Sequence, residues 1–201
     1  MAIPVYPATR GLIFDIDGTL VDTMPIHYKA SQLVCNSYGF DFPLDFFYKH
    51  AGTPTLKVFQ MLMAEKGLNL DGITLGLEKE KKYLELLDKD KVKPLPAVYD
   101  VVLAYKGKLP MALGTGATHE IAFRTLEAAG LKDQFSIIIT ADDVKNGKPA
   151  PDTFLLCAER MGIAPQFCQV FEDGDAGIEA AKAGGMMVTD IRKYINAPIN
   201  S

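Results

Sequence analysis

The chain has 201 residues, of which 48% are hydrophobic and 23% charged, a composition typical of a folded globular protein. Its net charge of −4 and isoelectric point near 5.4 argue against nucleic-acid binding. A nucleic-acid-binding protein needs a basic patch that matches the phosphate backbone. We therefore expect a protein that acts on small molecules, without a nucleic-acid partner.

The sequence also bears on the compartment. No apolar run approaches the roughly 18 residues that a membrane span requires, and the first ten residues, MAIPVYPATR, lack the charged and apolar segments of a secretory signal. The three cysteines, Cys35, Cys157 and Cys168, have no spacing typical of a metal site and predict buried, reduced thiols. We expect a cytoplasmic protein with no membrane partner, and a monomer.

The first predicted strand ends in two carboxylates. The apolar run Leu12-Ile13-Phe14 stops at Asp15, and Asp17 follows two residues later. Gly18 permits a sharp turn, which would bring Asp17 alongside Asp15. Two neighbouring acids in these positions suggest different chemical tasks, one as a nucleophile and the other in proton transfer.

Residues 24–92 contain helical patterns near 25–38, 54–66 and 76–89, and no convincing strand. The segment 91–98, with two prolines, is typical of a linker. The charged run at 78–91 alternates in sign and predicts a solvent-exposed helix face. We expect a helical cap at residues 23–92, inserted into a core formed by residues 1–22 and 93–201.

The remainder alternates short apolar runs with amphipathic stretches. Strands are predicted at 111–115, 136–140, 168–173 and 186–190, and helices at 118–129, 151–161 and 175–184. This alternation predicts the α/β class, with a Rossmann-like parallel sheet covered by helices and an inserted α-helical cap domain.

Ligands of open parallel sheets bind beyond the carboxyl ends of the strands. The residues expected there are mostly acidic, with one lysine and one threonine: Asp15, Asp17, Thr115, Lys148, Glu172 and Asp173. Several carboxylates in one crevice repel one another, and Mg²⁺ would relieve that repulsion. Lys148 and Thr115 could then bind the oxygens of a phosphate group.

Four segments carry a family resemblance: DIDGTLVDT (15–23), LGTG (113–116), KPAPDTF (148–154) and VFEDGDAGIEAAKAGG (170–185). They resemble the four motifs of the haloacid-dehalogenase-like phosphohydrolases. The position of the helical insertion resembles the branch that includes β-phosphoglucomutase. The resemblance covers nearly the whole chain. It is strong for small bacterial sugar phosphatases of the fructose-1-phosphate phosphatase type.

The resemblance implies a role for each motif residue. Asp15 would be the nucleophile that forms an aspartyl-phosphate intermediate. Asp17 would protonate the leaving oxygen and then deprotonate the hydrolytic water. Thr115 and Lys148 would bind the transferring phosphoryl group, with the Gly116 amide as a further donor.

A Mg²⁺ site is also implied by the resemblance. The Asp15 carboxylate, the Asp17 main-chain carbonyl and Asp173 would hold the ion, with Glu172 in or next to its coordination shell. The residue after Asp173, often Ser or Ala in relatives, is Gly174 here, for which we expect only a local effect.

The cap residues bear on the substrate. His27 falls where cap histidines of the mutase branch assist acid–base chemistry, although a helix-surface histidine is the alternative. Thr55 stands in a substrate-contacting loop where the mutases carry an arginine for a second phosphate, and threonine cannot form that charge-assisted pair. We therefore expect a Mg²⁺-dependent phosphatase for a small phosphorylated sugar or sugar acid. A phosphosugar mutase and a catalytically silent phosphate-binding protein are the alternatives.

Overall fold

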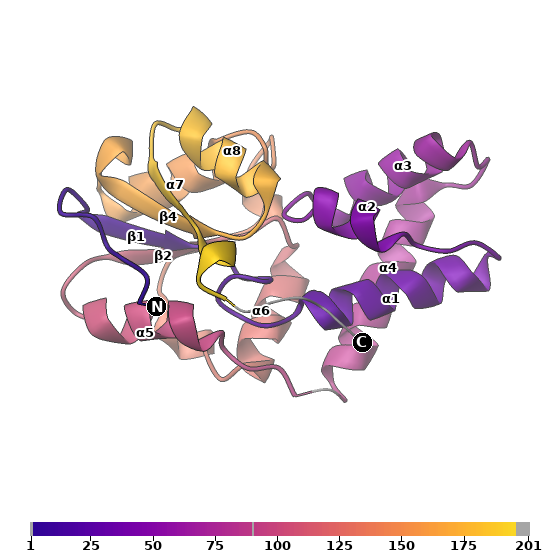
Figure 1. Cartoon of the computed structure of the whole chain (residues 1–201), viewed down its shortest axis with the longest axis horizontal. Helices are drawn as coiled ribbons and strands as arrows, with labels where there is room; N and C mark the ends of the chain where they lie inside the picture. The colour runs from indigo at the N-terminus through magenta and orange to yellow at the C-terminus, as the bar shows by residue number, and fades with distance from the viewer. Residues whose placement is uncertain (1, 90, 196–201) are drawn as a thin grey trace.

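A computed structural model describes residues 2–89 and 91–195, and its centre is a parallel β-sheet (Figure 1). The strand order is β3-β2-β1-β4-β5. The strands are β1 (Gly11–Phe14), β2 (Met111–Gly114), β3 (Ile138–Ile139), β4 (Cys168–Glu172) and β5 (Met187–Asp190). All four pairings between neighbouring strands are parallel, so the carboxyl ends of the strands lie at one edge.

Helices cover both faces of the sheet, because alternate strand residues point to opposite sides. In β1, Phe14 belongs to the core cluster with α5 (Pro96–Tyr105) and α6 (His119–Ala128). Ile13 belongs to the opposite cluster with α7 (Asp152–Met161) and α8 (Asp175–Ala183). The two helix pairs lie on opposite sides of the strands in Figure 1. The predicted Rossmann-like α/β core is confirmed.

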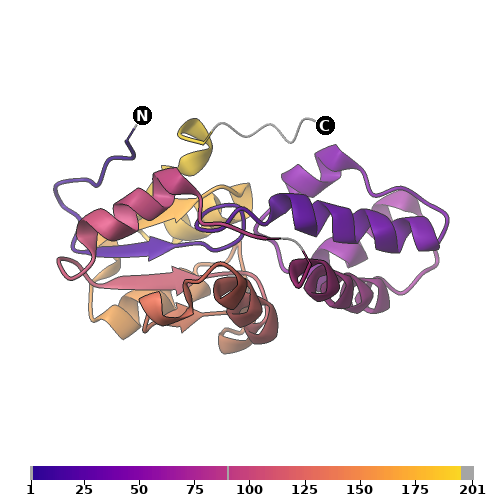
Figure 2. The ribbon, with the colours of Figure 1, turned by 90° about the horizontal axis from the view of Figure 1, so that it is seen from below.

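Four helices lie to one side of the sheet: α1 (Met24–Ser37), α2 (Leu44–Lys49), α3 (Thr55–Lys66) and α4 (Gly72–Leu87). They share a core cluster that includes Phe42, Phe46, Phe59 and Leu62. Two chain segments that connect these helices to the sheet run side by side (Figure 2). The Asp22 N–H donates to Lys93 O at 3.0 Å, and the Leu95 N–H donates to Leu20 O at 2.9 Å. The proposed domain boundaries at 22/23 and 92/93 stay a prediction.

Several elements differ from the sequence-based expectation. Helices α2 and α5 were not predicted: α2 has only six residues, and α5 is apolar on most sides and follows a proline-rich segment. Helix α4 begins at Gly72, where Asp71 caps it by accepting hydrogen bonds from the N–H groups of Ile73 and Thr74. Glycines at 72 and 76 obscure this start in the sequence, but they let α4 pack directly on α3, since a Cβ at Gly72 would lie 2.7 Å from Gln60 Cα.

The remaining structural expectations concern the cysteines and membrane spans. All three cysteines are free and buried, as predicted. Among the described residues, no helix is both long and apolar enough to cross a membrane.

Candidate active site

The carboxyl ends of β1 and β4 bring Asp15, Lys148 and Glu172 together. Because Phe14 pairs with Phe171, Asp15 follows β1 beside Glu172, the last residue of β4. Lys148 Nζ lies 2.6 Å from Asp15 Oδ1 and 2.6 Å from Glu172 Oε1. All three side chains are almost fully buried. Burial alone would lower the pKa of Lys148, but the charges of Asp15 and Glu172 outweigh it and raise that pKa. Lys148 is therefore a fixed cation.

The turn after Asp15 depends on Gly18, as the sequence predicted. Gly18 has φ +85°, and its N–H donates to Val21 O at 2.9 Å. A Cβ there would lie 2.4 Å from Asp173 Oδ2, so the position also makes room for that carboxylate. The Thr19 hydroxyl then donates to Asp173 Oδ1 at 2.8 Å. The turn thus places Asp173 against the first motif.

Three carboxylates form an acidic cluster with the composition of a metal site. One oxygen each from Asp15, Glu172 and Asp173 lies within 4.8 Å of the others. Burial raises the pKa of Asp15 well above its usual range; Lys148 opposes this rise, and the neighbouring carboxylates add to it. Burial and the charge of Glu172 raise the pKa of Asp173 to about 7. One lysine does not balance three carboxylates, so the donor set fits a hard divalent cation.

Within this cluster, both carboxylate oxygens of Glu172 already accept hydrogen bonds. Its Oε1 accepts from Lys148, and its Oε2 accepts from the Gly174 N–H at 2.7 Å. Gly177, in the first turn of α8, leaves room for this side chain, because a Cβ there would lie 1.8 Å from Glu172 Oε1. These contacts favour a role for Glu172 in positioning Lys148 beside the acidic cluster.

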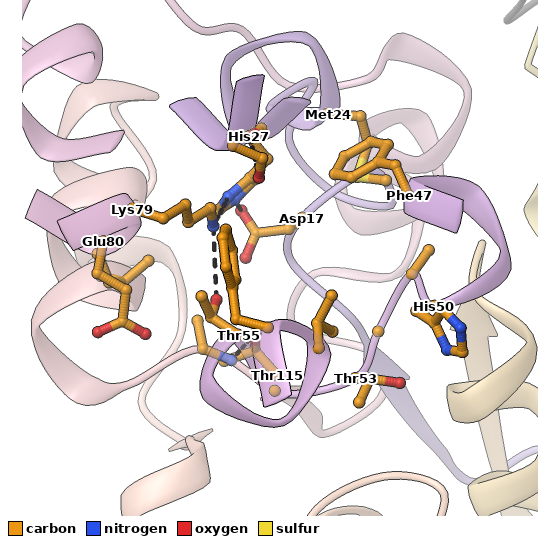
Figure 3. A pocket seen from close by; sticks show the side chains of 18 of the residues that line it. Asp17, Met24, His27, Phe47, His50, Thr53, Thr55, Lys79, Glu80 and Thr115 are labelled. Atoms are coloured by element: carbon orange, nitrogen blue, oxygen red, sulfur yellow. Dashed lines mark hydrogen bonds and ion pairs between the residues drawn. The ribbon is translucent and has the colours of Figure 1, made fainter. Parts of the chain in front are cut away.

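The carboxylate of Asp17 is turned away from the cluster, toward α1. Asp17 Oδ1 accepts from the Thr23 hydroxyl at 2.8 Å and contacts His27 Nε2 at 3.0 Å. His27 Nδ1 lies 2.7 Å from Lys79 Nζ on α4. Figure 3 shows Lys79, His27 and Asp17 next to one another in a row at the pocket. His27 therefore contacts a predicted acid–base residue and is not a solvent-exposed surface histidine.

The hydrogen bonds define the protonation of this row. The Lys79 ammonium can only donate, so Nδ1 of His27 accepts and Nε2–H donates to Asp17. Burial and the charge of Lys79 lower the pKa of His27, which favours this neutral imidazole. Burial would raise the pKa of Asp17, but His27 and the Thr23 hydrogen bond lower it overall. Burial lowers the pKa of Lys79 to about 8. The resting row is an ammonium, a neutral imidazole and a carboxylate.

The prediction of a solvent-exposed face at 78–91 is wrong at Lys79. Its side chain is buried, and it lies on the same stripe of α4 as the buried residues Leu75 and Tyr83, four positions away on either side. That spacing is the signal in the sequence that could have identified it. The alternating charges on either side of Lys79 obscured the stripe.

Two of the predicted phosphate-binding residues, Thr115 and Gly116, lie in the same pocket. Thr115 follows β2, and its Oγ1 accepts the Ala117 N–H at 3.0 Å, which leaves the hydroxyl proton available to a ligand. Thr115 and Gly116 line the pocket together with Asp15 and Asp17. Thr55, at the start of α3, also lines it, and its hydroxyl accepts from Lys79 Nζ at 3.4 Å. Six of the assigned residues line this pocket, and the other three, Lys148, Glu172 and Asp173, lie next to Asp15.

A cap loop at residues 50–55 lies directly on the core loops of the site. A Cβ at Gly116 would lie 2.9 Å from Gly52 O, and a Cβ at Gly174 would lie 2.6 Å from Ala51 O. Gly174 thus permits close approach of the cap, an effect that extends beyond its own loop.

The chain belongs to the haloacid dehalogenase-like hydrolase family, whose sequence profile matches residues 12–191. It is 45% identical to fructose-1-phosphate phosphatase YqaB of Escherichia coli (strain K12), over 94% of this chain and 99% of that protein. It is 33% identical to a phosphorylated carbohydrates phosphatase of Thermotoga maritima, over 88% of this chain and 82% of that protein. Family membership and these relatives identify the chain as a phosphoric monoester hydrolase.

The fold also matches a solved structure of the expected branch. β-Phosphoglucomutase from Clostridium difficile superposes with a TM-score of 0.79 and 26% identity, covering 90% of this chain and 83% of that one. The predicted resemblance to the β-phosphoglucomutase-like branch is confirmed.

Proposed function

We propose that the protein is a Mg²⁺-dependent phosphatase that hydrolyses a small sugar phosphate, similar to fructose 1-phosphate, through an aspartyl-phosphate intermediate. The observation that carries this proposal is the placement of two differently held carboxylates at one strand end. Asp15 lies 2.6 Å from the ammonium of Lys148, whereas Asp17 is held by Thr23 and His27. One is suited to nucleophilic attack and the other to proton transfer.

In the first step an Asp15 oxygen attacks phosphorus, and the bond between phosphorus and the sugar oxygen breaks. The leaving oxygen takes a proton from the Asp17 carboxyl group. Lys148, Thr115 and the Gly116 amide bind the oxygens of the transferring group and stabilise their charge. The products of this step are the free sugar and phosphorylated Asp15.

In the second step a water molecule attacks the phosphorus of phosphorylated Asp15. The Asp17 carboxylate accepts the proton of that water, and the bond between phosphorus and Asp15 breaks. Inorganic phosphate leaves, and Asp15 returns as a carboxylate. The proton on Asp17 passes back through His27 to Lys79, which restores the ionised Asp17 of the resting site.

Asp15 and Asp173 would hold the metal ion, with the Asp17 main-chain carbonyl as a further ligand. When bound, Mg²⁺ supplies positive charge to the transferring phosphoryl oxygens and to the crowded carboxylates. Glu172 would hold Lys148 in place beside it, because both of its oxygens are already hydrogen-bonded.

The row of Lys79, His27 and Asp17 supplies the proton that the first step requires. Asp17 is ionised in the resting site, so its proton must reach it before the sugar oxygen leaves. A proton moves from Lys79 Nζ to His27 Nδ1 while the Nε2 proton moves to Asp17. The 2.7 Å and 3.0 Å contacts make this path continuous.

Hydrolysis is favoured over phosphosugar mutase chemistry by the cap. A mutase must grip a second phosphate, and the loop position expected to do so carries Thr55. The nearby cation, Lys79, already contacts His27 and Thr55. The similarity to a fructose-1-phosphate phosphatase supports a ketose phosphate as the substrate.

The test is phosphate release from a panel of ketose and hexose monophosphates, with Mg²⁺ and with EDTA. We expect metal-dependent release, greatest with fructose 1-phosphate or a similar ester. Isomerisation of a hexose 1-phosphate that outpaces phosphate release when glucose 1,6-bisphosphate is added would instead establish the mutase.

A further inference from the structure

The cap side of the pocket holds an acidic residue that the mechanism does not use. Four titratable cap residues line the pocket: His27, His50, Lys79 and Glu80. His27 and Lys79 form the row to Asp17. Burial and the charge of Lys49 lower the pKa of His50, which favours its uncharged form. The remaining group, Glu80, is an acid.

Glu80 is half-buried and has no assigned role in holding the fold. No residue among 2–89 and 91–195 donates a hydrogen bond to its carboxylate. The adjacent residue, Lys79, contacts His27 and Thr55 instead. Figure 3 shows its side chain beside the Lys79 and Thr55 wall of the pocket. Carboxylate oxygens in such a position can accept hydrogen bonds from the hydroxyl groups of a ligand.

The core adds more negative charge near Glu80. Burial raises the pKa of Glu80, Lys79 opposes the rise, and the nearby carboxylates of Asp142 and Glu120 add to it. These two acids belong to the core, so acidic side chains of the cap and of the core lie near one another around Glu80. A second anionic group placed beside Glu80 would therefore meet electrostatic repulsion from these carboxylates.

We infer that Glu80 is a specificity-determining residue that accepts hydroxyl groups of an uncharged polyol portion and rejects substrates with a second phosphate. This inference rests on the proposed function, since it assigns the substrate class of that same site: phosphate monoesters whose remaining portion is neutral and hydroxylated. Two features would then discriminate against a second phosphate on the substrate: repulsion by Glu80, and Thr55 at the position where the mutases carry an arginine.

The test compares fructose 1-phosphate with fructose 1,6-bisphosphate, using the full chain with Mg²⁺. Glu80→Gln removes the charge and keeps the shape. Glu78→Gln removes the same charge from an exposed position of the same helix, where its Oε1 accepts the Tyr38 hydroxyl. Values of kcat/KM are measured for both esters. Isothermal titration calorimetry on Asp15→Asn proteins, with and without each change, measures binding without turnover.

We expect the wild-type and Glu78→Gln proteins to prefer the monophosphate by at least about tenfold in both measurements. Glu80→Gln should remove most of that preference, chiefly by improving the bisphosphate. The inference would be overturned if Glu80→Gln kept the wild-type preference for the monophosphate over the bisphosphate. It would also be overturned if Glu78→Gln lost that preference to the same extent as Glu80→Gln. Absence of phosphate release from either ester, with the binding preference intact, would refute the proposed function and leave the selectivity standing. Absence of binding to both esters would refute both.

Discussion

The imidazole ring of His27 stacks on the ring of Tyr83, with the centroids 3.9 Å apart and the planes 8° from parallel. The Tyr83 hydroxyl is joined to the Thr125 hydroxyl on α6 at 2.8 Å. Tyr83 therefore connects the histidine of the proton path to a core helix, and it fixes the ring plane in which His27 reaches both Asp17 and Lys79.

Replacing Tyr83 tests this positioning role. Tyr83→Leu should lower kcat by about tenfold, because the imidazole loses the surface that orients it, while KM changes little. Tyr83→Phe keeps the ring and should retain near wild-type kcat, at a cost of about 1 kcal/mol in the free energy of unfolding for the lost hydrogen bond to Thr125. Steady-state kinetics and urea unfolding check both. Equal kcat values in the two variants would refute the positioning role.

Removing Lys79 should change both the rate and its pH dependence. The ammonium supplies a proton, and its pKa is lowered to about 8, so wild-type kcat should fall as the pH rises through about 8. Lys79→Met should lower kcat by about 100-fold at pH 7 and abolish that alkaline decline. Lys81→Met, an exposed neighbour on the same helix, serves as the control and should keep the wild-type profile. An alkaline decline that persists in Lys79→Met would assign it to another group.

Gly174→Ala tests the close approach of the cap. The backbone at Gly174 has φ −99° and ψ 141°, which alanine adopts without strain, but its Cβ would meet Ala51 O at 2.6 Å. We expect kcat/KM to fall about tenfold, because the cap loop can no longer sit fully on the core. The free energy of unfolding should stay within about 0.5 kcal/mol of wild type. A variant with unchanged kinetics would show that closure does not depend on this contact.

Much of this site could be predicted because the chemistry sits at strand ends. Asp15 and Thr115 directly follow apolar strands and Glu172 ends one, and parallel pairing brings such positions to one edge. The side-chain direction of Asp17 could not be predicted in the same way, since it depends on where α1 places Thr23 and His27.

The structure of the cap was harder to predict from the sequence than that of the core. Lys79 is a buried cation in a run of mostly exposed charges, and the alternating charges obscured its four-residue spacing from Leu75 and Tyr83. Helix α2 is too short for a helical period to be recognised in the sequence, although Phe46 packs in the cap core.

The buried ion pairs of Lys148 lead to a stability prediction. Lys148→Met leaves Asp15 and Glu172 without their cation in a buried site, and it should reduce the free energy of unfolding by about 3 kcal/mol in EDTA. Lys132→Met removes an exposed pair with Glu127 and should cost less than about 1 kcal/mol. Urea unfolding measures both. A loss in Lys148→Met no larger than in Lys132→Met would show that the pairs are not needed for folding.

The central claim is that Asp15 carries the phosphoryl group, and a direct measurement is mass spectrometry of acid-quenched enzyme. Asp17→Asn is mixed with Mg²⁺ and p-nitrophenyl phosphate, whose leaving group does not need the acid, so that only the second step is blocked. We predict one added phosphoryl group per chain, located on Asp15 by peptide mapping, and none in the Asp15→Asn/Asp17→Asn double variant. An unmodified chain that still releases p-nitrophenol, or a phosphoryl group on another residue, would contradict the account.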